Sequence, residues 1–141
     1  MLIRSQYTSE IEDCNQPWTF KPNSIDYVHI KYLVGSIPDW YELFKQAYIV
    51  CTPGGYLESV EGTSVFESDD GTLGEAMAQW GEIFVEGGKK IGNTFTVYGE
   101  GIQRKAMEQA GFINIQEQEF KVSHLGEMES SRLAGQLFVV I

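Results

Sequence analysis

Apolar residues dominate positions 25–30, and most residue types there favour β-structure. A short apolar run of this kind is typical of a strand that is covered on both faces, as in a parallel sheet. Between positions 39 and 50 the apolar residues instead recur every three or four residues, which predicts an amphipathic helix. Pro53-Gly54-Gly55 is predicted to end this helix, and positions 56–60 to form the next strand. Together the segments predict one βαβ crossover with two parallel strands.

A second helix is predicted after the polar loop at 67–71. Thr72 is followed three residues later by Glu75, which is the pattern of a capping box. The next apolar residues share one helix face and are predicted to form core or a lid: Leu73, Met77, Trp80 and Phe84. Gly87-Gly88 is predicted to stop this helix.

The C-terminal third predicts one more helix and two strands. Positions 100–110 have helical spacing, and Gly111 suits the residue just past a helix end. Positions 112–116 alternate like a half-buried strand, and a change of phase predicts a bulge or bend near 117–119. Positions 136–141 are strongly apolar and predict a buried last strand. Met1 to Ser9 is either a short edge strand or an unpaired leader.

Composition places the chain among globular proteins of one domain, because 43% of its 141 residues are hydrophobic and 13% aromatic. The formal net charge of −10 argues against nonspecific nucleic-acid binding, which needs a basic surface. Two interpretations of the acidity stay open: solubility, or a basic protein partner. Cys14 and Cys51 have no metal-ligand spacing, so no metal site is predicted. No secretory signal and no membrane-spanning run is predicted, which favours a cytoplasmic or nuclear location.

Several motifs together carry a resemblance to a known family over roughly positions 10–122. In the N-terminal half they are Glu12-Asp13-Cys14, Gln16-Pro17-Trp18, Phe20, Asp26-Tyr27-Val28-His29, Leu33 to Trp40 and Pro53 to Glu58. In the C-terminal half they are Ser68 to Thr72, Ala78 to Gly81, Gln103 to Met107 and Ala110-Gly111-Phe112. With these motifs the chain resembles the fungal class I S-adenosylmethionine (SAM)-dependent methyltransferases of the type that includes the velvet-complex regulator of secondary metabolism.

The resemblance implies an α/β fold with a partial Rossmann-like sheet, in which parallel strands are joined by crossover helices and the C-terminal strand is antiparallel. It implies one domain over residues 1–141, with a divergent tail from residue 123. It also implies SAM as the cofactor. The family's first strand and its glycine-rich SAM loop would lie upstream of Met1, so the chain is expected to be truncated at its N-terminus, with weak or no activity on its own.

The resemblance also assigns cofactor contacts. Asp13 matches the acidic residue that lies beside the adenine of SAM in the family, with Cys14 next to it, and a carboxylate can accept a hydrogen bond from an adenine amino group. The alternative is that Asp13 caps its own turn. Tyr32 and Lys31 follow the first strand, where ligands bind in open α/β folds, and Tyr32 is assigned to the cofactor. Trp18 is interpreted as core, with cofactor stacking as the alternative.

His29 is the candidate catalytic residue, because a histidine near a strand end can act as a general base. Its alternative is a hydrogen-bonded core histidine. Glu58 and Glu61 are candidates for a polar cleft or for a solvated edge.

Three hypotheses of function follow. The first is a methyltransferase domain, weakly active or completed by a partner chain, with a small-molecule or protein acceptor. The second is an inactive interaction module, which forms a homo-oligomer or pairs at an exposed sheet edge with a full-length methyltransferase or a regulator. The third is an unrelated binder of small ligands in the crevice near His29 and Tyr32.

Overall fold

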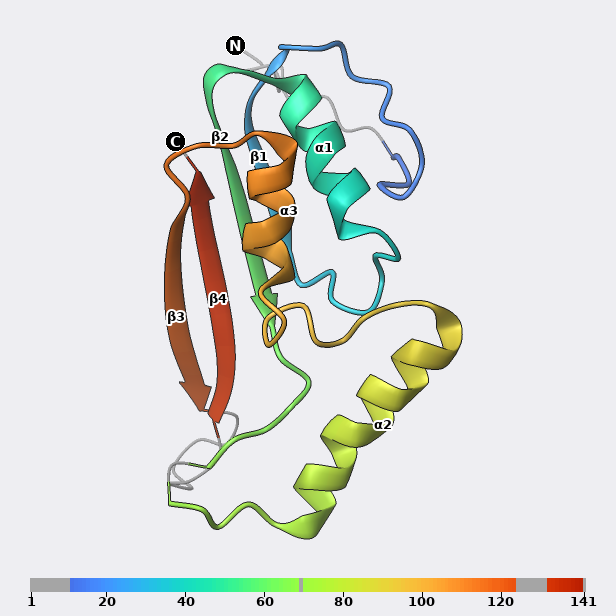
Figure 1. Cartoon of the computed structure of the whole chain (residues 1–141), viewed down its shortest axis with the longest axis vertical. Coiled ribbons are helices and arrows are strands. Elements are labelled where there is room, and N and C mark those ends of the chain that lie inside the picture. The colour runs from blue at the N-terminus through green and yellow to red at the C-terminus, as the bar shows by residue number, and fades with distance from the viewer. Residues whose placement is uncertain (1–10, 69, 124–131, 141) are drawn as a thin grey trace, which may run out of the picture.

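The computed structural model describes residues 11–68, 70–123 and 132–140. Its helices and strands follow in the order β1 (Ile25–Lys31), α1 (Trp40–Val50), β2 (Cys51–Gly62), α2 (Glu75–Ile91), α3 (Ile102–Ala110), β3 (Gln116–Ser123) and β4 (Arg132–Val140). The four strands form one sheet in the order β1-β2-β4-β3. Helices α1 and α3 lie side by side on one face of this sheet, and α2 extends away beyond the end at which β1 and β2 finish (Figure 1).

The predicted βαβ crossover is confirmed, and with it the α/β class. Strands β1 and β2 are parallel, with Val28 opposite Leu57. Asp39 caps α1 by accepting a hydrogen bond from the backbone N–H of Glu42 at 3.0 Å. The apolar side of α1 packs on the sheet, and its buried residues are Trp40, Leu43, Phe44, Ala47 and Val50.

The prediction that Pro53-Gly54-Gly55 forms the turn that ends α1 is wrong. The helix ends at Val50, and β2 already begins at Cys51, whose backbone is extended. The pairing then shifts, because Ile25 lies opposite Cys51 whereas Tyr27 lies opposite Tyr56. The triplet therefore forms an irregularity within β2. Proline is tolerated there because it has no N–H to pair, and Gly54 can adopt its φ of 82° because it has no side chain.

Helix α2 also differs from its prediction at both ends. Its N-cap is Gly74, and the N–H of Thr72 instead donates to Asp70 Oδ1 at 3.0 Å, so no capping box forms. The helix runs through Gly87 and Gly88 and ends before Gly92, at φ 78°. Gly88 permits a close approach, because a Cβ there would lie 2.6 Å from the ring of Phe95.

The predicted core role of the α2 stripe is not found, since Trp80 is 52% exposed and no residue of the stripe is buried. Phe84 rests on Phe95, with 5.4 Å between ring centroids. These residues lie over loops and not over the sheet. Of the two predicted roles, core or lid, only the lid remains.

The strand predicted at 112–116 begins only at Gln116 and runs to Ser123. Asn114 has φ 57°, which breaks the extended backbone that the alternation suggested. Pairing between β3 and β4 continues without a shift along β3, so the bulge predicted near 117–119 does not form. The predicted antiparallel C-terminal strand is confirmed: β4 lies between β2 and β3 and is antiparallel to both. Met1 to Ser9 and Ile141 lie outside the described residues.

Candidate functional site

The loop after β1 begins at the carboxyl end of the parallel strands. Tyr32 continues the pairing by donating its N–H to the carbonyl of Val60 at 2.9 Å, and then turns the chain with φ 55°. Its side chain is 65% exposed, and Lys31 Nζ lies 5.0 Å from the centre of its ring. Tyr32 and Lys31 therefore stand where ligands approach open α/β sheets, as predicted.

A buried carboxylate holds this loop in place. Glu61, near the end of β2, is fully buried and accepts hydrogen bonds from the backbone N–H groups of Leu33 at 3.0 Å and Val34 at 2.9 Å. Burial raises the pKa of Glu61, and the two hydrogen bonds oppose that rise. Glu61 is therefore an internal support of the loop and not a residue of a solvated edge.

The segment that carries Asp13 and Cys14 lies against the same loop. Asn15 Nδ2 donates to the carbonyl of Ser36 at 3.2 Å. Asp13 is exposed, and its Oδ1 accepts the N–H of Asn15 at 3.0 Å, so it does cap its own turn. Cys14 is partly buried beside Pro38, and burial raises the pKa of its thiol.

Trp18 follows the core interpretation. It is partly buried against the central apolar cluster, and its indole N–H donates to the carbonyl of Cys14 at 3.2 Å. Its backbone N–H donates to Gln46 Oε1 on α1 at 2.7 Å. Trp18 thus fixes the Asp13–Cys14 segment against α1.

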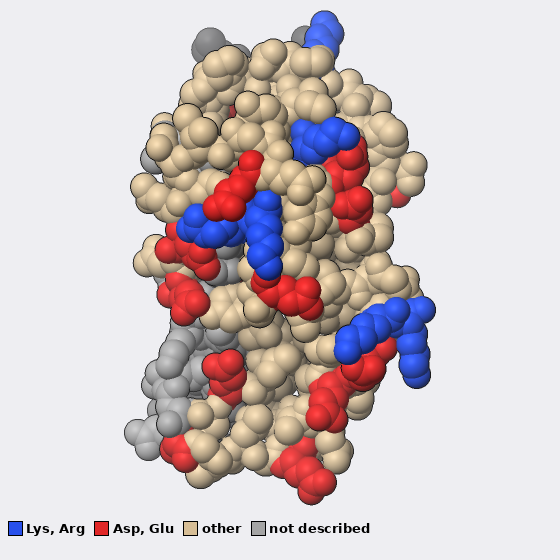
Figure 2. All heavy atoms as spheres, in the orientation of Figure 1, with Lys and Arg blue, Asp and Glu red and all other residues tan. Residues whose placement is uncertain are grey.

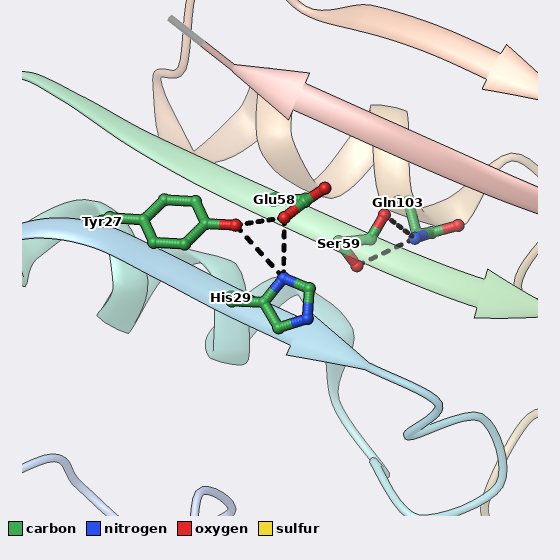
Figure 3. Close-up of polar contacts among 5 residues, drawn as sticks. All are labelled: Tyr27, His29, Glu58, Ser59 and Gln103. Carbon is green, nitrogen blue, oxygen red and sulfur yellow. Dashed lines mark hydrogen bonds and ion pairs between the residues drawn. The ribbon is translucent and has the colours of Figure 1, made fainter.

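His29 lies elsewhere, on the face of the sheet opposite α1 and α3, in a cluster with Tyr27 and Glu58 (Figure 3). Its Nδ1 is 2.8 Å from Glu58 Oε2 and 3.3 Å from the Tyr27 hydroxyl, which also donates to Glu58. The hydrogen bonds from Tyr27 and from His29 lower the pKa of Glu58, and the Tyr27–Glu58 bond raises the pKa of Tyr27.

This cluster has the geometry of an oriented base. When Nδ1 carries the proton and donates it to Glu58, Nε2 keeps its lone pair and can accept a proton. The imidazole is 44% exposed, so His29 is hydrogen-bonded but is not a core residue. Sequence reasoning singled out Glu58 but did not identify it as the partner of His29. The signal for the cluster was the spacing of Tyr27 and His29 at i and i+2, which places both side chains on one strand face.

The predicted site residues therefore fall into two groups. Tyr32 begins the loop after β1 and the Asp13–Cys14 segment lies against that loop, whereas the hydrogen bonds of His29 lead to Glu58 and Tyr27 on the sheet face. No group of residues that could hold a metal occurs in the described part of the chain. Nor does that part contain a helix long and apolar enough to cross a membrane.

Two hollows differ in size and place. The one beside Cys14 holds about 100 Å³ and is lined by Pro38, Asp39 and Leu43. A larger one of about 390 Å³ lies at the amino end of β2, between Tyr48, Gly54 and Phe112. The larger hollow is thus at the end of the sheet opposite the predicted crevice.

Comparison with known proteins places this geometry in a family. The chain is 37% identical over 107 residues to the probable methyltransferase tdiE of Emericella nidulans, which is 74% of this chain and 32% of that protein. It is 33% identical to the methyltransferase pytC of Aspergillus terreus, over 79% of this chain and 34% of that one. It is 29% identical to the secondary metabolism regulator LAE1 of Cochliobolus heterostrophus, over 79% of this chain and 37% of that protein. The chain is a relative of fungal proteins named methyltransferase or secondary metabolism regulator.

Solved structures give the same fold. A SAM-dependent methyltransferase of Methanosarcina mazei matches 93% of this chain and 65% of its own, with a TM-score of 0.63 at 15% identity. A phosphoethanolamine N-methyltransferase of Haemonchus contortus, solved with S-adenosylhomocysteine, matches 88% of this chain and 35% of its own, with a TM-score of 0.57 at 17% identity. No protein-family model matches the chain. This methyltransferase relative spans about a third of the length of the curated fungal proteins it matches.

Proposed function

We propose that the chain forms one side of the site of a SAM-dependent methyltransferase. The observation that supports this most directly is the loop after β1, which Glu61 holds from inside and the Asp13–Cys14 segment flanks from outside. The loop presents an exposed aromatic side chain, Tyr32, at the carboxyl end of a parallel sheet. Its fungal relatives named methyltransferase support the same activity.

The described residues fit one edge of the cofactor. Asp13 is an exposed carboxylate and can accept a hydrogen bond from an adenine amino group in addition to its turn bond. The hollow beside Cys14, at about 100 Å³, is well below the roughly 300–1,000 Å³ of usual ligand sites. These residues would contact the adenine side of SAM and would not enclose the molecule, so we expect weak binding by this chain.

When bound, SAM supplies a methyl group on a sulfonium sulfur. The residues of this chain would position an acceptor and take up its proton. His29 is the proposed base, with Nε2 free to accept while Glu58 holds Nδ1. Because His29 lies on the β1–β2 face and not beside the Asp13–Cys14 segment, this role requires an acceptor, a small molecule or a protein side chain, that extends from the loop after β1 onto that face.

Titration calorimetry with S-adenosylhomocysteine tests the cofactor role. We expect a dissociation constant on the order of millimolar, because only a part of the donor contacts is present. Asp13→Ala is expected to weaken binding about tenfold, which is the value of one hydrogen bond to a charged group. Asp26→Ala is the control, since Asp26 bonds to Thr52 at the other end of β1. A complete absence of binding heat at millimolar ligand contradicts the proposal.

The interaction module is a second candidate, and the position of β1 favours it. Among the described strands β1 is at one edge of the sheet and pairs only with β2. Its free side could accept a strand from a full-length methyltransferase or a regulator. Capture of a full-length relative by the chain, lost when Tyr27→Pro or His29→Pro is introduced, supports this role. Failure to capture it counts against the module.

A cytoplasmic or nuclear location stays a prediction from the sequence.

A further inference from the structure

Helix α2 touches the rest of the protein through a narrow side. Its two buried residues are both glycines, Gly81 and Gly88. A Cβ on Gly81 would lie 3.3 Å from the backbone of Ser64 and Val65, and one on Gly88 would lie 2.5 Å from the carbonyl of Asn93. The helix thus rests on two loops by these two glycines, together with Phe84, whose ring contacts Phe95.

A second, exposed apolar stripe runs beside that contact. Three large side chains lie on it: Trp80 is 52% exposed, Ile83 66% and Ile91 68%. The stripe is completed by Ala76 and Gly87, both exposed, so that its members stand at 76, 80, 83, 87 and 91. These steps of four and three residues are the spacing with which one helix packs along another. Exposed apolar surface with this period indicates a helix partner.

The stripe is complementary to itself. A Cβ placed on Gly87 would meet nothing within 4 Å, so there is open space above this residue. In an antiparallel pair of α2 helices, centred between Ile83 and Phe84, Trp80 of each copy faces Gly87 of the other. A large side chain then enters a gap that only glycine leaves, as knobs enter holes in coiled coils.

The charges along α2 favour the antiparallel direction. Glu75, Glu82 and Glu86 occupy the first four turns, whereas Lys89 and Lys90 are in the last turn. Figure 2 shows blue atoms at the upper end of α2 and red atoms along the rest of the helix. An antiparallel partner brings the lysine end of one copy to the Glu75 end of the other, while a parallel partner brings like charges together.

We propose that two copies of the chain associate through the 76–91 stripe of α2 as an antiparallel, two-fold symmetric helix pair. This surface is separate from the proposed methyltransferase site and from the β1 edge. Each copy contributes the same stripe to the interface, as two-fold symmetry requires. A single helix pair about 25 Å long forms a small interface, so we expect a dissociation constant on the order of 10 µM.

Sedimentation equilibrium of the full chain from about 1 to about 300 µM tests the proposal. We expect a monomer–dimer equilibrium that Trp80→Lys weakens about tenfold or more. Gly87→Leu is expected to weaken it similarly by filling the hole, although leucine stabilises a helix relative to glycine, so unfolding cannot explain that result. Ala78→Gln is the control, because Ala78 is exposed on the far side of α2 and glutamine adds no charge at the Glu75 end.

Charge exchange distinguishes this geometry from other dimers. Glu75→Lys alone should weaken association, and its combination with Lys89→Glu and Lys90→Glu should restore it, since both ends then carry exchanged charges. A chain that stays monomeric over the whole range overturns the proposal. So does a dimer that is indifferent to both Trp80→Lys and Gly87→Leu. Quenching of Trp80 by an aromatic methyl acceptor in a strictly monomeric chain would assign the stripe to substrate instead.

Discussion

At the scale of single residues, Glu61 shows how a chain of net charge −10 uses one carboxylate inside the fold. The turn after β1 leaves two backbone N–H groups without strand partners. The two oxygens of Glu61 accept hydrogen bonds from these groups in place of water. We expect Glu61→Ala to lower the free energy of unfolding by about 2–4 kcal/mol, because both N–H groups lose their acceptor. Glu61→Gln should cost less, since one acceptor remains. Glu67→Ala, at an exposed position, is the control in urea unfolding.

The pH dependence of the same residue has a definite sign. Burial raises the folded-state pKa of Glu61 above its ordinary value of 4.5, so the folded chain binds the proton more tightly than the unfolded chain does. This contribution to stability is complete below the ordinary pKa and is lost as pH rises through the folded-state pKa. The unfolding free energy of the wild type should therefore fall relative to that of Glu61→Gln as pH increases from about 4.5. A flat or rising difference would contradict the burial of a charged group.

The Tyr27–His29–Glu58 cluster gives a second residue-scale prediction. The bond to Glu58 raises the pKa of Tyr27, so Glu58→Gln should return that phenol toward its ordinary pKa in an NMR titration of the tyrosine ring carbons. Tyr98 provides a matched case, because its bond to Glu119, at 2.8 Å, raises its pKa to about 12. Glu58→Gln should change the pKa of Tyr27 and leave that of Tyr98 unchanged, and Glu119→Gln should do the reverse. If Glu58→Gln leaves Tyr27 unchanged, the proposed orientation of His29 by Glu58 is wrong as well.

At the scale of elements, a buried amide fixes α3 on β2. Gln103 and Ser59 are both fully buried, and Gln103 Nε2 donates to Ser59 Oγ at 2.8 Å (Figure 3). Gln103 Oε1 has no hydrogen-bond partner among the described residues. Ser59→Ala alone should destabilise the fold by about 1–3 kcal/mol, because it leaves the amide without its partner hydroxyl. The double variant Ser59→Ala with Gln103→Leu should recover most of that loss.

A thermodynamic cycle of these variants is the measurement. Recovery in the double variant gives a coupling energy between the two sites, whereas additive losses would show that Gln103 stabilises α3 through packing alone. Arg104→Leu serves as a control on the neighbouring position, because Arg104 is half-buried and pairs with Glu117 and Glu108 and not with Ser59.

The elements also show what the sequence could predict. Helical spacing gave α1 and its buried face correctly, because local pattern and tertiary packing agree there. Pro53-Gly54-Gly55 carries the local signal of a turn, yet pairing with β1 continues past it, and only the neighbouring strand decides this. The alternation at 112–116 fails for the same reason, since β3 begins where β4 supplies its partner. Glu58 and Glu61 differ by three residues on one strand and therefore face opposite sides, but their roles depend on what lies opposite each.

At the scale of the whole molecule, the sheet is unequally covered. Helices α1 and α3 bury one face, on which Leu57, Ser59 and Glu61 lie, while Tyr27 and His29 remain exposed on the other. The sequence predicted both parallel strands and the antiparallel C-terminal strand, but it contains no local signal for the order of β2, β4 and β3. That order makes the end of the chain a central strand of the sheet.

This order gives a prediction for the whole fold. Leu137 on β4 lies opposite Val60 of β2 and Gln118 of β3, so the three residues form one rung of the sheet. Proline at position 137 removes an N–H inside a central strand and distorts pairing on both sides, which should cost about 3 kcal/mol or more. Gln118→Pro, in the same rung but on the edge strand β3, should cost clearly less, because β3 has one described neighbour.

Urea unfolding of the two proline variants, followed by near-UV circular dichroism, compares them directly. Both variants introduce proline into the same rung, so the comparison reports mainly where the strand lies in the sheet. If Gln118→Pro is as damaging as Leu137→Pro, β3 must be as fully enclosed as β4. If Leu137→Pro is harmless, β2 does not depend on β4, and the loop that Glu61 supports at the end of β2 would keep its shape without the C-terminal strand. The predicted ranking instead makes the last strand of the chain a condition for the proposed site.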